Sequence, residues 1–219
     1  RFFLSATLAK RRLAPLPAHN FPFDVAYGYH FDAYLVGAFL RSHAESRGVR
    51  HIEGRVGEIL VDAKGSIASL SLDGGRILDG HFFVDATGFR SLLLQDRLGV
   101  PFHSYKDNLF NDSAVVMPTP PDPSGLGSAT RAIAMNAGWR WDIPLTNRSG
   151  NGYVYSSDFI TADEAEREHR AALGLLESET AARHLKMKVG RVDRHWEKNC
   201  LAVGLSQGFI EPLEATALH

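Results

Sequence analysis

The sequence predicts a mixed α/β fold of the α+β kind, in which short strands, some of them antiparallel, alternate with helices. Two apolar runs, at 82–84 and 200–203, each end in a glycine-containing turn that leads toward residues with helix-forming character. A third stretch, 138–145, alternates tryptophan with charged residues at the period of a strand. The length of 219 residues suffices for one good core or for part of a larger two-part fold.

Composition restricts the partners and the compartment. With 44% hydrophobic and 22% charged residues, the chain has the balance of a globular protein. Its formal net charge of −1 gives no reason to expect nucleic acid or an anionic membrane as a partner, and no apolar run approaches the length that spans a bilayer. The one cysteine, Cys200, cannot form an internal disulfide. We therefore expect a protein of the reducing cytoplasm.

Local signals predict two longer helices. Asp32 has the residue type of a helix N-cap, and apolar residues follow it at helical spacing up to Gly48, which ends the helix. The second helix is predicted over 161–176, where Thr161 is the cap and Glu164 completes a capping box.

Turn residues separate a series of short strands. Residues 1–24 contain three prolines and read as a loop, and residues 91–98 read as helical. A helix followed by a meander of three antiparallel strands is expected over 32–84. The strand candidates are 51–61, 66–72, 81–84, 113–117, 129–135, 153–156 and 189–196.

The stretch 82–90 joins a buried strand to a tight turn, Asp85-Ala-Thr-Gly88, that leads toward a helix. The small residues keep the turn tight, and Gly88 would let the backbone approach a cofactor closely. A strand-to-helix turn without any ligand is the alternative. The residues alone leave both interpretations open.

The tryptophan stretch has the pattern of a strand with two different faces. Trp139, Trp141 and Ile143 would share one face, and Arg140 and Asp142 would share the other. The pair of indoles would therefore pin an antiparallel sheet to the core.

The last sixteen residues contain a second glycine-rich turn. After the strand at 200–203, Gly204 and Gly208 precede Pro212, whose missing donor costs nothing in a first helical turn. A helix beginning there would point backbone N–H groups at one spot, which suits an anion or the polar edge of a cofactor. An ordinary turn and helix with solvated Glu211 and Glu214 is the alternative.

Two motifs together resemble a known family. Residues 208–216, with the sequence GFIEPLEAT, resemble the closing GF-x-EPLE-x-T segment of the flavin-dependent tryptophan halogenases. Residues 139–144 fit that family's W-x-W-x-I-P signature, in the family's order and at about its spacing. One departure is that Ala215 stands where the family usually has serine.

The resemblance implies roles for individual residues. Glu214 would be the base or orienting carboxylate at the substrate end, and Thr216 and Ala217 would offer the halide a backbone nest. Trp139 and Trp141 would keep the substrate away from the flavin. No metal site is implied. The residues that would line the FAD site are Asp85, Ala86, Thr87, Gly88, Gly204, Gly208, Phe209 and Pro212.

The resemblance also implies the fold and the reaction. The fold would be the flavin-binding fold of FAD-dependent monooxygenases, with an antiparallel sheet lining the substrate side. A separate flavin reductase would supply diffusible FADH2, and a flavin hydroperoxide would oxidise chloride or bromide to hypohalous acid. The oxidant would then halogenate an electron-rich aromatic substrate of the tryptophan or indole type, in the biosynthesis of an antibiotic or another secondary metabolite.

Two features of that family have no counterpart in this sequence: the GxGxxG turn of the FAD domain and a lysine in a matching context. We therefore expect the chain to be the central part of a single halogenase domain, truncated at both ends and inactive alone. Residues 1–100 and 185–219 would form the flavin side, and 101–184 would form the sheet and helix of the substrate side.

Two other functions remain open at this point. An FAD-dependent aromatic hydroxylase would share the fold, although such enzymes usually have aspartate after the strand's glycine, where Leu205 follows Gly204 here. They also lack the tryptophan pair. The other alternative is a remnant that keeps the sheet but binds no cofactor.

Overall fold

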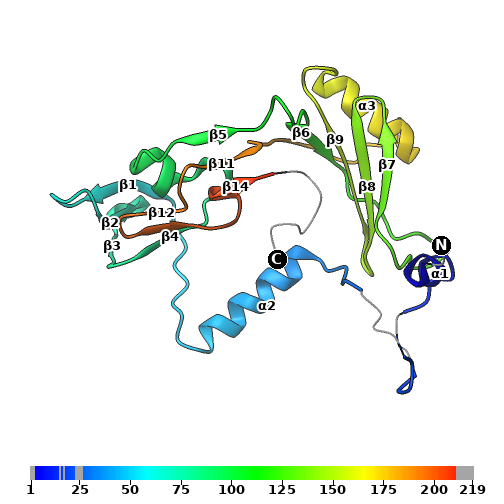
Figure 1. The fold of residues 1–219 in the computed structure, drawn as a ribbon, viewed down its shortest axis with the longest axis horizontal. Coiled ribbons are helices and arrows are strands. Elements are labelled where there is room, and N and C mark those ends of the chain that lie inside the picture. Colours follow the sequence, from blue (N-terminus) through cyan, green and yellow to red (C-terminus); the bar gives the residue numbers. More distant parts are fainter. Residues whose placement is uncertain (1–2, 15, 17, 23–26, 211–219) are drawn as a thin grey trace. The chain divides into compact units, whose positions relative to one another are not determined.

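A computed structural model describes residues 3–14, 16, 18–22 and 27–210. Their contacts divide the chain into two compact units (Figure 1). The first unit takes in described residues of 1–50 and 114–185, and the second takes in those of 51–113 and 186–210. Residues 27–50 thus group with the large sheet of 114–185.

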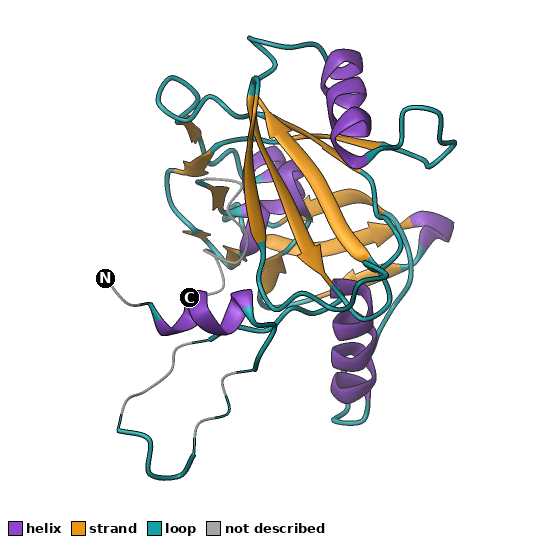
Figure 2. Ribbon diagram, turned by 90° about the vertical axis from the view of Figure 1, so that its right-hand side faces the viewer, coloured by secondary structure: helices purple, strands orange, loops and turns teal. Residues whose placement is uncertain are grey.

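The first unit is built on a five-stranded sheet in the order β10-β6-β9-β8-β7 (Figure 2). Strands β7, β8 and β9 form an antiparallel meander, as the alternating sequence predicts. The strands are β6 (Ser113–Val116), β7 (Arg131–Met135), β8 (Gly138–Pro144), β9 (Ser149–Tyr155) and β10 (Arg183–Lys186).

The register of β8 confirms that the two tryptophans share a face. Trp139 lies opposite Val154, and Trp141 lies opposite Gly152. The two indole rings are 6.1 Å apart, centre to centre, and tilted by 57°. Gly152 is required beside them, because a Cβ at that position would overlap the Trp141 indole.

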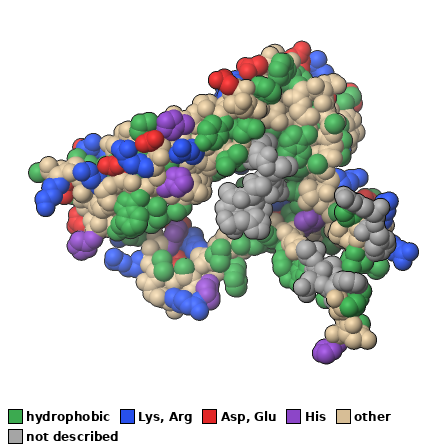
Figure 3. Space-filling view, in the orientation of Figure 1, with side chains coloured by type: hydrophobic (Ala, Val, Ile, Leu, Met, Phe, Trp, Pro, Cys, Tyr) green, Lys and Arg blue, Asp and Glu red, His purple; other side chains and the backbone are tan. Residues whose placement is uncertain are grey.

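Helix α3 (Ala162–Leu173) lies against β9 and begins at the predicted capping box. Thr161 Oγ1 accepts a hydrogen bond from Glu164 N, and Glu164 Oε2 accepts one from Thr161 N. The helix ends three residues before the predicted end, because Gly174 adopts the left-handed conformation with φ 71°. Its outer surface carries acidic and basic side chains, visible at the upper edge of the space-filling view (Figure 3).

The inner face of α3 packs on aromatic residues of β9. Ala165 belongs to a buried cluster with Val115, Tyr153 and Tyr155. The Tyr153 hydroxyl donates to Glu168 and accepts from a backbone N–H of the β7–β8 turn, and burial raises the pKa of Tyr153 to about 12. This hydroxyl therefore joins the helix to the sheet.

Two helices precede the sheet. The prediction of a loop over residues 1–24 is wrong for α1 (Leu4–Lys10), because the prolines begin only at residue 15 and the residues before them are good helix formers. Helix α2 (Ala33–Glu45) confirms the predicted cap, since Asp32 accepts from Tyr34 N at 2.9 Å. Asp32 also accepts from Arg148 Nε at 3.0 Å, which ties the helix start to the β8–β9 turn.

The second unit contains three small sheets. Strands β1 (Val56–Val61), β2 (Ile67–Leu72) and β3 (Ile77–Asp79) form the predicted antiparallel meander. The third strand is not the predicted 81–84. A tight turn at Gly74 and Gly75, both with positive φ, returns the chain at once.

Strand β4 (Phe83–Asp85) instead joins β12 (Trp196–Glu197) and β13 (Cys200–Ala202) in the order β12-β13-β4. The predicted strand at 200–203 is therefore confirmed, and it pairs in parallel with β4. The remaining sheet has the order β14-β11-β5, from β5 (Phe102–Ser104), β11 (Gly190–Val192) and β14 (Gly208–Phe209). The predicted helical segment at 91–98 is a short π-helix, Leu92–Arg97.

One core holds this second unit together. Its buried members come from the meander, the β4–β13 pair, β11, the π-helix and the residues just after it: Ile67, Phe83, Leu93, Leu94, Val100, Val192, Cys200 and Ala202. Across the described ranges of both units, no helix combines the length and apolar character needed to cross a membrane.

The Trp141–Gly152 contact generates a prediction about stability. Gly152→Ala would force the indole or the strand to shift, and overpacking of this kind costs about 1–3 kcal/mol of unfolding free energy. The matched control is Gly150→Ala on the same strand, where the nearest atom to a new Cβ is 3.5 Å away. Urea unfolding of the complete gene product measures both. Equal unfolding midpoints for the two variants would contradict the packing described.

Candidate functional site

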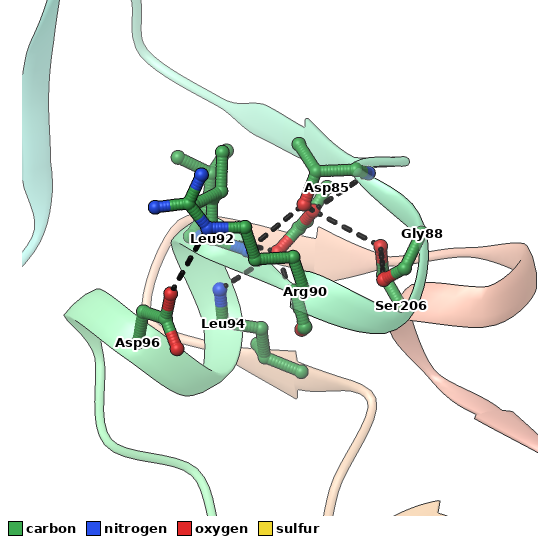
Figure 4. A network of polar contacts seen from close by, with 10 residues as sticks. Asp85, Gly88, Arg90, Leu92, Leu94, Asp96 and Ser206 are labelled. Atoms are coloured by element: carbon green, nitrogen blue, oxygen red, sulfur yellow. Dashed lines mark hydrogen bonds and ion pairs between the residues drawn. The ribbon is translucent and has the colours of Figure 1, made fainter. Parts of the chain in front are cut away.

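The candidate site lies where β4 and β13 end. Because β4 and β13 are parallel, with Ala202 opposite Asp85, the chain leaves both strands at the same end of the sheet. The turn after β4 and the turn after β13 therefore lie side by side (Figure 4). Phe89 from the first turn meets Phe209 beyond the second, with ring centres 5.5 Å apart in an edge-to-face arrangement.

A buried carboxylate joins these two turns. Asp85 is fully buried. Its Oδ1 accepts from Thr87 N at 3.0 Å and from Thr87 Oγ1 at 2.7 Å. Its Oδ2 accepts from Leu93 N and Leu94 N, each at 2.9 Å, at the start of the π-helix. From the other turn, Ser206 Oγ lies 3.1 Å from Asp85 Oδ1.

The hydrogen bonds keep this carboxylate ionised. Burial alone would raise the pKa of Asp85, but the donors from Thr87, Leu94 and Leu93 outweigh burial and hold its pKa below the usual value. The pKa of Cys200, on the neighbouring strand β13, is also shifted. Burial, with a smaller contribution from the Asp85 charge, raises the pKa of the Cys200 thiol to about 11.

The backbone of both turns is open at a glycine. Gly88 has φ 73° and Gly204 has φ 58°, and a Cβ at either position would meet no atom within 4 Å among the described residues. Ser91 is left-handed as well, with φ 46°, and its N–H donates to Gly88 O at 3.0 Å. As far as the described residues go, each turn thus has room at its glycine.

This arrangement fits the polar part of a cofactor such as FAD. Ligands of open α/β folds bind outside the carboxyl ends of parallel strands, which is where both turns lie. The side chain of Asp85 points into the protein, so a ligand would meet the backbone of Ala86, Thr87 and Gly88 rather than the carboxylate. The parts of the chain that the structure describes hold no group of three or more residues suited to a metal ion.

The structure groups some of the predicted site residues and not others. The structure places the predicted site residues at 85–88 in the turn that adjoins the Gly204 turn, and Gly208 and Phe209 follow directly after that second turn. Trp139 and Trp141 belong to the first unit. The predicted roles of Pro212, Glu214, Thr216 and Ala217 fall outside the described residues.

Sequence reasoning missed Ser206 and Ser91. Ser206 Oγ lies 3.1 Å from both Asp85 Oδ1 and Gly88 O, and Ser91 Oγ lies 3.3 Å from Asp85 Oδ2. Both serines are fully buried. A serine in a glycine-rich turn is ordinary, so only the pairing of strands far apart in sequence shows what these hydroxyls contact.

Solved structures show which class of protein has this fold. BrvH, a flavin-dependent halogenase from Brevundimonas sp. BAL3, is similar with a TM-score of 0.87 at 36% identity, covering 97% of this chain and 44% of that chain. The tryptophan 6-halogenase SttH from Streptomyces toxytricini is similar with a TM-score of 0.83 at 44% identity, covering 86% and 39%. The fold is thus the FAD-binding fold of the flavin-dependent halogenases.

Residues 4–219 match the family described as tryptophan halogenase. In sequence, SttH is 45% identical over 194 residues, 88% of this chain and 37% of SttH. Tryptophan 7-halogenase RebH from Lentzea aerocolonigenes is 45% identical over 219 residues, 99% of this chain and 40% of RebH. The chain belongs to the tryptophan halogenase family, and it spans about two fifths of the length of these relatives.

The burial of Cys200 generates a prediction about its reactivity. The thiol is fully buried and its pKa is raised to about 11, so iodoacetamide should leave it unmodified in the folded protein at mildly alkaline pH. In urea the same thiol should react fully. Mass spectrometry of the tryptic peptide measures both. Labelling of Cys200 in the folded protein as fast as in urea would contradict the position of β13 in the core.

Proposed function

We propose that the protein containing this chain is a flavin-dependent halogenase that acts on an electron-rich aromatic substrate of the tryptophan or indole type. The family match over residues 4–219 carries the proposal, because it includes both the paired turns and the tryptophan strand. Relatives named as tryptophan 6-halogenase and tryptophan 7-halogenase support this substrate class.

In this proposal the paired turns hold FAD. The backbone of Ala86–Gly88 and of Gly204, together with the Gly208–Phe209 strand and Pro212, would bind the cofactor. Two observations support this role: a Cβ at Gly88 or Gly204 would meet none of the described residues, and both turns lie at strand ends. Reduced FAD supplies the reducing equivalents that activate O2, so that a halide can be oxidised.

The chain's own residues would then direct the oxidised halogen. Glu214 would accept the proton lost from the aromatic ring, and the backbone at Thr216 and Ala217 would hold chloride or bromide. The Trp139–Trp141 pair would prevent direct contact between substrate and flavin. Support for that barrier comes from the placement of both indoles on one face of β8, where Gly152 leaves room for Trp141.

The proposal includes a partner and a compartment. A separate flavin reductase would deliver FADH2 by diffusion in the cytoplasm, and no membrane or nucleic acid would take part. The composition of the chain supports the last point, since its formal net charge is −1.

Product analysis tests this function directly. The complete gene product would be incubated with FADH2 from a reductase, O2 and tryptophan, with chloride, with bromide or with neither. A monohalogenated product that depends on the halide is expected. An oxygenated product formed without halide would contradict the proposal and indicate an aromatic hydroxylase.

A substitution at Glu214 tests the role of the base. Glu214→Gln keeps the size of the side chain and removes its proton acceptor, so halogenation should slow by roughly 100-fold. Consumption of FADH2 should be unchanged, because this carboxylate is proposed to face the substrate. Glu177→Gln, an exposed glutamate of the first unit, is the control. Full halogenation by Glu214→Gln would remove the assigned role.

A further inference from the structure

We propose that Asp85 is a positioning residue, which joins the turn after β4 to the turn after β13 and thereby sets the affinity of the paired turns for FAD. The inference rests on the proposed function for its ligand, and on the geometry of the second unit for the role of the carboxylate. Asp85 itself would not touch the cofactor.

The Asp85 carboxylate is fully used inside the protein. Asp85 is fully buried, and six donor atoms lie within 3.3 Å of its oxygens, three at each. A carboxylate has about four lone-pair sites, so no acceptor capacity remains for a ligand. The donors are Thr87 N, Thr87 Oγ1, Ser91 Oγ, Leu93 N, Leu94 N and Ser206 Oγ.

The first turn is held by this carboxylate through Thr87. Thr87 Oγ1 donates to Asp85 and accepts from Leu92 N at 2.8 Å, so the hydroxyl links the carboxylate to the start of the π-helix. With Leu93 N and Leu94 N bound to the other oxygen, Asp85 fixes both ends of the turn that contains Gly88. The open backbone at Gly88 is therefore held in place by the carboxylate beneath it.

The second turn reaches the same carboxylate through Ser206. Ser206 is 121 residues from Asp85 in sequence, yet its hydroxyl lies 3.1 Å from Asp85 Oδ1 and 3.1 Å from Gly88 O. The backbone adds one link, from Val203 N to Asp85 O at 2.9 Å. Ser206 thus sets how the Gly204 turn lies against the Gly88 turn, and a cofactor that contacts both turns depends on that placement.

Three substitutions separate this role from general stability. Ser206→Ala removes only the hydroxyl contact between the two turns. Thr87→Val keeps the shape of the side chain but removes the hydroxyl, and Thr87→Ser restores the hydroxyl. Tyr153→Phe in the first unit is the matched control, because it also removes one buried hydroxyl.

FAD affinity is the first measurement, made by titration of the complete gene product. Without the hydroxyl that holds the turns together, fewer molecules keep the binding geometry, and a competent fraction of about one tenth raises Kd about tenfold. We expect that rise for Ser206→Ala and Thr87→Val, near-normal Kd for Thr87→Ser and Tyr153→Phe, and a normal turnover rate at saturating FADH2 for Ser206→Ala and Tyr153→Phe. A normal Kd in both Ser206→Ala and Thr87→Val would overturn the inference.

Amide hydrogen exchange of the cofactor-free protein is the second measurement. Ser206→Ala should speed exchange in 86–92 and 203–207, and leave the exchange of β8 and β9 unchanged. Unchanged exchange in both turns would overturn the inference. If the wild-type protein bound no FAD, the proposed function would fail, while the exchange measurement would still decide whether Asp85 and Ser206 join the turns.

Discussion

The candidate site depends on the hydrogen bonds made by one buried, ionised carboxylate. Parallel pairing of β4 and β13 brings two turns to one edge of a sheet, but pairing alone leaves open how the turns lie against each other. Asp85 resolves this by accepting from donors in both turns and from the start of the π-helix. A buried charge is costly unless its hydrogen bonds are satisfied, and here they are.

In the first unit, too, single residues determine how the elements pack. Trp139 and Trp141 occupy one face of β8, and a glycine on β9 leaves room for the second indole. On α3, Glu168 accepts from Tyr153, so that helix and strand are joined by a hydroxyl as well as by apolar packing. In each unit a small or polar neighbour therefore determines how a strand or turn packs: Gly152 beside Trp141, and Ser206 beside Asp85.

The sequence predicted what depends on neighbours along the chain, and missed what depends on distant ones. The capping box at Thr161 and Glu164, the Asp32 cap and the shared face of the tryptophans are local patterns, and the structure confirms them. The pairing of 83–85 with 200–202 brings together strands more than a hundred residues apart, so the third strand of the meander was misplaced. Ser206 was missed for the same reason, since its partner lies 121 residues away.

The carboxyl 13C chemical shift of Asp85, followed by NMR as the folded protein is acidified, tests the central claim most directly. The hydrogen bonds around Asp85 hold its pKa below the usual value of 3.8, so its signal should remain that of an ionised carboxylate while exposed aspartates titrate. Titration of Asp85 at or above 3.8 would contradict the account, because a protonated carboxyl group could not accept all the hydrogen bonds that join the two turns.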